Sequence, residues 1–164
     1  MGVKMKLDNI SKRLLKEIAD LHEIPNGAVS FRKNGKSYIQ TTKNIEIFKK
    51  EDLSGIDIVV HSSCKGEACH IPVVVSEDGL FEVVYNDFFI EDGAEVVIVA
   101  GCGVHSNAGA GHDGIHSLHI GKNAKVTYIE NHLATGDGLH KELSPVTHIN
   151  LGEGSELIMN TTQI

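Results

Sequence analysis

The sequence lacks tryptophan and has few aromatic residues of any kind, which make up 5% of its 164 residues. A core without large rings has to be filled by Val, Ile, Leu and Ala, side chains that suit the repeated packing of a sheet protein. The hydrophobic fraction of 41% and the charged fraction of 23% are ordinary for a globular domain and exclude a disordered chain.

A basic surface is also lacking. The chain has 15 Lys and Arg against 22 Asp and Glu, which gives a net charge of −7. The adjacent basic residues are isolated pairs: Lys12-Arg13, Arg32-Lys33 and Lys49-Lys50. This balance repels a phosphate backbone, so we expect no nucleic-acid partner.

No segment is suited to cross or target a membrane. The apolar run Val96 to Ala100 is far too short to span a bilayer, and Met1 to Leu7 has no signal-peptide pattern. We therefore expect a cytoplasmic protein with no membrane partner. Its three cysteines, an odd number, then favour free thiols or metal ligands over structural disulfides.

Common nucleotide and hydrolase motifs are absent. The sequence contains no GxxxxGK[ST], GxGxxG or GxSxG. This excludes the usual P-loop ATPases, dinucleotide enzymes and α/β hydrolases.

The N-terminal part predicts a helix and a hairpin. Residues 9–22 carry one apolar stripe, whose members are four, four and three positions apart, and this predicts a helix. Asp8 or Asn9 can cap the start of the helix, and residues 25–27 stop it. Asn34-Gly35 between two short apolar runs predicts a two-residue hairpin turn. The stripe consists of Ile10, Leu14, Ile18 and Leu21.

A different pattern recurs further along. Three units, beginning at Ile90, Ile120 and Leu151, each have an apolar residue, a turn at Gly or Asn, a small residue and a strand. They begin 30 and 31 residues apart, and this period is typical of the stacked coils of a solenoid. The alternative fold is an antiparallel sandwich that has three similar turns by chance. We predict a mainly β protein with a β-solenoid core over residues 71–164, continuous with a helix-and-hairpin segment over residues 1–70.

One segment gathers residues able to bind a metal ion. Cys102 and His105 have C-x-x-H spacing, and His112 and His116 follow, with five glycines between positions 101 and 114 expected to let the backbone fold tightly. Thiolate and imidazole bind zinc, iron or an iron–sulfur cluster. Alternatively, Cys102 is a nucleophile with a lowered pKa, or the histidines lie on a solvated rim.

Other candidate ligands give weaker signals. Cys64-x₄-Cys69-His70 has looser spacing than common zinc sites, and two free thiols explain it equally well. Strand alternation places His116 inside and His119 outside. Three further histidines are expected at the surface or in turns, although a solenoid could bring one of them beside Cys102: His132, His140 and His148.

Four segments together resemble the SufB/SufD-like family of iron–sulfur cluster assembly scaffolds, and most closely its short SufB-related forms. The resemblance covers roughly residue 24 to the end, and its most specific part is Gly-Cys-Gly-Val-His around Cys102. The segments are 71–75, 84–90, 99–105 and 116–126.

This resemblance implies a right-handed parallel β-helix and a scaffold rather than a stand-alone enzyme. It implies that Cys102 accepts sulfur, that iron or an iron–sulfur cluster binds transiently, and that nearby histidines assist; zinc is an alternative metal. The implied partners are a sulfur donor protein, a second scaffold subunit or a second copy, and an ABC-type ATPase. Family members are usually longer and end in helices that dock the ATPase. Because this chain ends at Ile164, we expect a fragment or an end that another subunit covers.

Two other functions stay open. The first is a zinc or iron enzyme of the hydrolase or lyase type on a β-solenoid or cupin-like sheet. It would hold its metal through His105, His112 and His116, with Asp113 or Glu130 as a general base. The second is a partner-binding module without chemistry. The run Val96 to Ala100, which is apolar on both faces of the predicted strand, would favour it.

Overall fold

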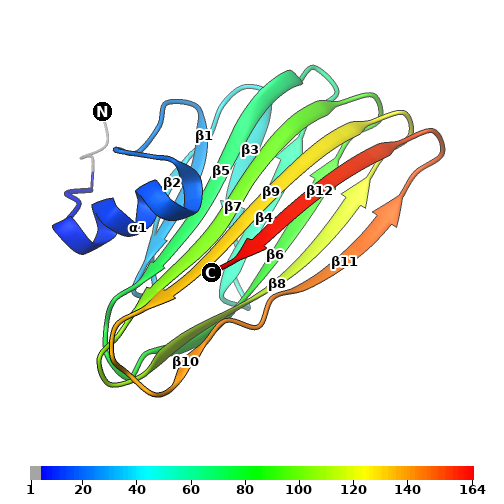
Figure 1. Ribbon diagram of the computed structural model, residues 1–164. Coiled ribbons are helices and arrows are strands. Elements are labelled where there is room, and N and C mark those ends of the chain that lie inside the picture. The colour runs from blue at the N-terminus through cyan, green and yellow to red at the C-terminus, as the bar shows by residue number, and fades with distance from the viewer. Residues whose placement is uncertain (1–4) are drawn as a thin grey trace.

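The computed structural model describes residues 5–164, and these form a mainly β protein with one short helix (Figure 1). The first four residues of the predicted N-terminal segment lie outside the described part. The elements are α1 (Asn9–Ala19), β1 (Ala28–Lys33), β2 (Lys36–Gln40), β3 (Ile45–Lys49), β4 (Gly55–Val60), β5 (Lys65–Val75), β6 (Phe81–Ile90), β7 (Glu95–His105), β8 (Ala110–Ile120), β9 (Lys125–Thr135), β10 (Lys141–Glu142), β11 (Val146–Leu151) and β12 (Glu156–Gln163).

Helix α1 begins as the sequence predicts but ends earlier. The side chain of Asp8 accepts a hydrogen bond from the Ser11 N–H at 2.8 Å and so caps the first turn. Asp20 adopts a left-handed conformation (φ 52°), and its N–H bonds to carbonyls of the last turn, which closes the helix. The helix therefore ends three residues before the predicted end at residue 22. The buried face consists of Ser11, Leu14, Leu15 and Ile18.

The predicted hairpin is formed by β1 and β2. Asn34 and Gly35 both have positive φ angles, 47° and 80°, as a type I′ turn requires. A second antiparallel pair, β3 with β4, follows it. Strands β2 and β3 form the edges of the two sheets at the N-terminal end of the solenoid.

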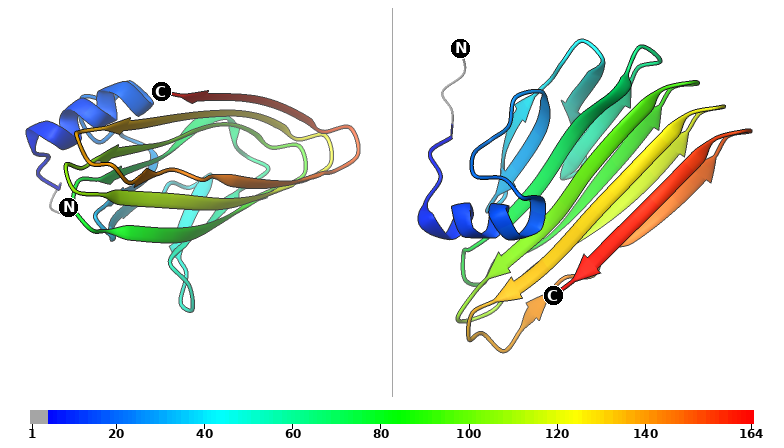
Figure 2. Two further views of the ribbon diagram at one scale, coloured as in Figure 1. Left: turned by 60° about the horizontal axis from the view of Figure 1, so that its bottom comes forward. Right: turned by 45° about the horizontal axis from the view of Figure 1, so that its top comes forward.

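The remaining strands form a parallel β-solenoid of about four turns, which confirms the predicted fold. The chain alternates between two sheets, one ordered β12-β9-β7-β5-β1-β2 and the other β10-β8-β6-β4-β3, with β11 also paired to β8. The coils wind in a right-handed sense (Figure 1). Figure 2 shows the two sheets facing each other, so their inward side chains form one continuous interior.

The repeat seen in the sequence is the coil of the solenoid. Ile90 is the register partner of Ile120, and Ile120 is the partner of Leu151. The turn residue in each unit has the left-handed conformation that Gly and Asn tolerate. These residues are Gly93 (φ 71°), Asn123 (φ 56°) and Gly154 (φ 68°).

Helix α1 packs on the outer face of the sheet that contains β7 (Figure 2). A Cβ atom at Gly101 would lie 3.1 Å from Ile18 Cβ, and one at Gly103 would lie 3.0 Å from Leu14 Cβ. The expectation that these glycines form a tight loop was therefore wrong. They lie in a regular strand and let the helix approach the sheet.

The two predicted segments share a strand, because β5 runs continuously through residue 70. Strands β1 and β4 also pair with β5 and β6, so the N-terminal part forms part of the two sheets. Among the described residues, no helix has the length and apolar character needed to cross a bilayer.

Candidate functional site

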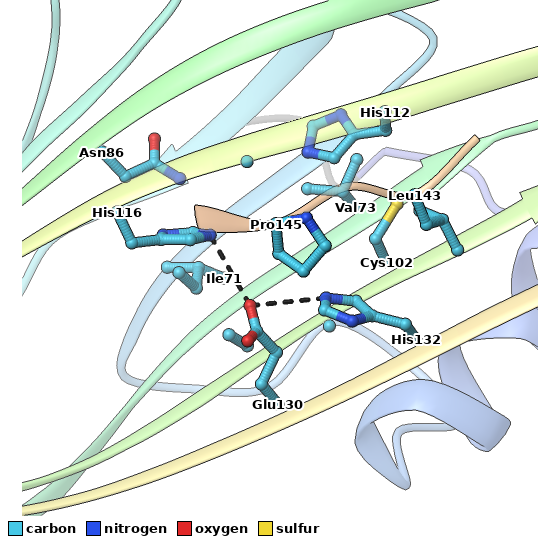
Figure 3. A pocket seen from close by; sticks show the side chains of 13 residues that line it. Ile71, Val73, Asn86, Cys102, His112, His116, Glu130, His132, Leu143 and Pro145 are labelled. Atoms are coloured by element: carbon cyan, nitrogen blue, oxygen red, sulfur yellow. Dashed lines mark ion pairs between the residues drawn. The ribbon is translucent and has the colours of Figure 1, made fainter. Parts of the chain in front are cut away.

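A small cavity of about 20 Å³ lies between the two sheets, and its volume has room for about one water molecule. Much of its lining is polar, whereas the main core of the solenoid is apolar (Figure 3). Besides Asn86, the polar side chains that line it are Cys102, His112, His116, Glu130 and His132.

Strand alternation and coil stacking place these residues together. Glu130 and His132 are two apart on β9, and His112 and His116 are four apart on β8, so each pair shares one face. Cys102 on β7 is the register partner of His132. The predicted inward direction of His116 and outward direction of His119 are confirmed, since their side chains are 8% and 42% exposed.

Glu130 lies at the centre of the polar cluster. Its Oε1 accepts a hydrogen bond from the Tyr128 hydroxyl at 3.1 Å and lies 3.6 Å from His116 Nε2 and 3.4 Å from His132 Nε2 (Figure 3). Burial acts to raise the pKa of Glu130, but contacts with His132, His116 and Tyr128 outweigh it and hold the pKa below its usual value. Glu130 is therefore an ionised carboxylate near neutral pH.

The ring nitrogens that face this carboxylate are Nε2 of His116 and Nε2 of His132, and an ionised carboxylate favours a proton on the nitrogen that faces it. The other ring nitrogen, Nδ1, is buried without a hydrogen-bond partner in both residues. Both imidazoles and the Cys102 thiol line the same cavity, and these are donor types that soft transition-metal ions take.

His116 is neutral at pH 7. Its burial lowers the pKa of the imidazole to about 4, and the neighbouring His112 and His132 act in the same direction, against the opposing effect of Glu130. Its contact with Glu130 is accordingly not an ion pair at that pH. A neutral imidazole is the form that binds a metal.

Cys102 does not have the lowered pKa that was one expectation from the sequence. The thiol is 3% exposed, and burial raises its pKa well above the usual value; carboxylates at Glu82, Glu130 and Asp113 act in the same direction. A tight glycine turn with a nearby His suggested a thiolate, but an interior strand beside three carboxylates stabilises the thiol. Ionisation of Cys102 needs a proton acceptor or a bound cation.

The segment between β10 and β11 closes the cavity on one side. Leu143 and Pro145 line it, and both lie beside the polar cluster in Figure 3. Between them, the Ser144 N–H donates a hydrogen bond to Asp113 Oδ1 at 2.9 Å. Because the cavity has room for about one water molecule, a larger reactant fits beside Cys102 only if lining residues move.

His105 does not line the cavity. It is three residues from Cys102 on the same strand, and an odd spacing places the two side chains on opposite faces of the sheet. Its Nδ1 lies 2.9 Å from Thr135 Oγ1 and 3.3 Å from a guanidinium nitrogen of Arg13 on helix α1. The C-x-x-H spacing forms a chelate in a turn but not in an extended strand.

The second predicted cluster also lies apart from the cavity. Cys64 and Cys69 are buried in the main apolar core, and burial raises the pKa of Cys69 to about 12. Cys69 is four positions, about 13 Å, along β5 from the register partner of Cys102. His70 points to the opposite face, where burial lowers its pKa. All three cysteines are free.

His132 is the one of the three further histidines that the solenoid brings beside Cys102. It is 5% exposed, because one coil of 30 residues separates it from Cys102. The other expectation, a position at the surface or in a turn, was wrong for this residue. His140 and His148 are exposed, as predicted.

Within residues 5–164, no three His, Cys, Asp or Glu side chains have donor atoms placed to hold a metal ion. Binding an ion in the cavity therefore requires side-chain movement. Comparison of the chain with models of protein families finds no match, and comparison with curated protein sequences finds none either.

Proposed function

We propose that this protein is a component of iron–sulfur cluster assembly, with Cys102 as the sulfur acceptor and His112 and His116 as ligands for iron. The observation that carries the proposal is that these three residues, predicted from the sequence, line one interior cavity. The parallel β-solenoid around them is the fold that the family resemblance implies. Iron and the cluster are cargo in this function.

The donor chemistry of the cavity supports the proposal. Thiolate and imidazole are the ligands that iron–sulfur clusters and zinc take in proteins. Glu130 faces the Nε2 atoms of His116 and His132, in the way that a carboxylate orients metal-binding histidines. We therefore add Glu130 as an orienting residue and His132 as a further ligand.

Sulfur transfer to Cys102 begins with loss of the thiol proton. In this proposal His132, the register partner of Cys102 on the next coil, accepts that proton. The thiolate attacks the outer sulfur of a persulfide on the donor protein, the S–S bond of the donor breaks, and the donor leaves as a thiolate. Cys102 then carries the persulfide, and no external oxidant or reductant is consumed.

The implied partners belong to the same proposal. These are a sulfur donor protein, a second scaffold subunit or a second copy, and an ABC-type ATPase, acting in the cytoplasm. The support for these partners is the resemblance of residues 71–75, 84–90, 99–105 and 116–126 to the SufB/SufD-like family. The buried position of Cys102 adds that residues around the cavity have to move before the donor can reach the thiol.

Sulfur loading tests the role of Cys102. The protein is incubated with a cysteine desulfurase and cysteine, and persulfide on each cysteine is measured by mass spectrometry after alkylation. We expect loading of the wild type, none of Cys102→Ser, and normal loading of Cys69→Ser, a control that removes another buried thiol. Full loading of Cys102→Ser would contradict the proposal.

A metal-dependent hydrolase or lyase is the second candidate, and one observation favours it. Glu130 is a buried carboxylate between two imidazoles and could act as a general base for metal-bound water. Its ligands would be His112, His116 and His132, since His105 lies outside the cavity. One tightly bound zinc or iron ion without acid-labile sulfide would favour this function over cluster assembly.

A further inference from the structure

A chain of three charged or polar side chains leads into the cavity from the N-terminal end of the solenoid. Arg32 on β1 donates to both oxygens of Glu82 on β6, with Nε at 3.1 Å from Oε1 and a terminal guanidinium nitrogen at 2.8 Å from Oε2. Glu82 Oε1 lies 2.8 Å from Nδ1 of His112 on β8. The three side chains are 13%, 9% and 5% exposed, so this chain is an interior feature.

The geometry fixes where the proton of His112 lies. A carboxylate that accepts from a guanidinium on both oxygens is ionised and can only accept further hydrogen bonds. The short contact with His112 therefore requires a hydrogen on Nδ1. In neutral His112 the remaining nitrogen, Nε2, carries the lone pair.

This arrangement is the reverse of that in the two other cavity histidines. His116 and His132 turn Nε2 to Glu130 and leave Nδ1 without a partner. His112 turns Nδ1 to Glu82 and leaves Nε2. Each imidazole thus has one nitrogen directed to a carboxylate and the other free of it.

We propose that Arg32 and Glu82 are positioning residues that hold His112 in the Nδ1–H tautomer, so that Nε2 is its metal-binding atom. Arg32 acts through Glu82, because its planar guanidinium fixes the carboxylate in one orientation. Glu82 in turn fixes the imidazole, as second partners of metal-binding histidines do. The metal part of this inference rests on the proposed function, whereas the tautomer does not.

One consequence is that the N-terminal hairpin contributes to the site. Arg32 lies on β1, before the coil that contains Cys102. Its register partner Val73 on β5 lines the cavity. The predicted helix-and-hairpin segment therefore supplies a residue that orients a cavity histidine.

The test uses a double variant, Arg32→Met/Glu82→Met. Removing both charges together avoids leaving one of them buried without its partner, which a single substitution would do. Lys50→Met/Asp57→Met/Asp87→Met is the control, because it removes a set of paired charges remote from the cavity. Circular dichroism establishes that both variants are folded.

The first readout is the tautomer of His112 in the metal-free protein. Long-range ¹H–¹⁵N correlation spectra of protein labelled at histidine distinguish protonated from unprotonated ring nitrogens, and His112→Gln identifies the signals. We expect Nδ1–H alone in the wild type and in the control, and loss of this single tautomer in the double variant. A wild-type His112 protonated on Nε2 alone, or the same tautomer in the double variant, would overturn the inference.

The second readout is the affinity for Zn²⁺, measured by competition with a chromophoric chelator. We expect the double variant to bind Zn²⁺ about 10- to 100-fold more weakly than the wild type, and the control to bind it equally well. Equal affinity in the double variant would refute the role of His112 Nε2. If the wild type binds neither Zn²⁺ nor iron, the proposed function fails, and the tautomer alone decides whether Arg32 and Glu82 position His112.

Discussion

Lowering the pH of the metal-free protein is expected to weaken its fold through His116. This side chain is 8% exposed, and burial lowers its pKa to about 4 from the ordinary value of 6.5. Between these two values the unfolded chain binds a proton at His116 and the folded chain does not. The stabilisation is complete above pH 6.5 and is lost as the pH falls toward 4.

The size of the effect follows from the shift in pKa. One pH unit corresponds to about 1.4 kcal/mol when the unfolded state binds one more proton than the folded state. His116 should therefore lower the free energy of unfolding by about 2 kcal/mol between pH 6.5 and 5, and by about 3 kcal/mol by pH 4. Its nearly complete burial means that solvent screening removes little of this effect.

The assay is urea unfolding at several pH values between 7 and 5, with a chelator present, followed by circular dichroism. His116→Gln removes the titrating group but keeps a donor for Glu130, and His119→Gln is a control at an exposed histidine. The stability advantage of the wild type over His116→Gln should shrink by about 2 kcal/mol from pH 7 to 5, because other titrating groups cancel in the difference. An advantage that does not change with pH would refute the reasoning, as would an equal change in the control.

Three other predictions concern the interior. Gly55→Ala should destabilise the fold by about 1–3 kcal/mol more than Gly66→Ala in thermal unfolding. Both glycines have positive φ angles, but only at Gly55 would a Cβ atom overlap the backbone of β6. Tyr128→Phe should cost about 2 kcal/mol in urea unfolding, because it removes the hydroxyl that donates to Glu130; a neutral effect would contradict that bond. Cys102 should react with an aromatic disulfide reagent at pH 8 far more slowly in the native than in the unfolded protein, and equal rates would refute its burial.

Much of the fold could be predicted from the sequence because the solenoid is periodic. The units at Ile90, Ile120 and Leu151 stack in register, and the Gly or Asn in each occupies the predicted left-handed turn. The end of helix α1 could not be predicted, since it depends on Asp20 adopting a conformation uncommon for a residue other than Gly. The run Val96 to Ala100, apolar on both faces, indicates that β7 is covered, but no local pattern shows that helix α1 supplies the cover.

The candidate site was predicted only in part. Cys102, His112 and His116 line one cavity, but His105 faces the other side of β7 because the segment is a strand and not a turn. That the solenoid could bring a further histidine beside Cys102 was one expectation, but the sequence did not single out His132, whose spacing to Cys102 is one coil. The burial that raises the pKa of Cys102 is a property of the stacked sheets and leaves no local mark in the sequence.

The most direct test of the proposed function is anaerobic purification followed by analysis of iron, zinc and acid-labile sulfide. The wild type, Cys102→Ser and Cys69→Ser are compared after expression under the same conditions. Cluster assembly predicts iron with a matching amount of sulfide in the wild type and in Cys69→Ser, and loss of both in Cys102→Ser. Metal without sulfide in the wild type, or iron and sulfide retained in Cys102→Ser, would contradict it.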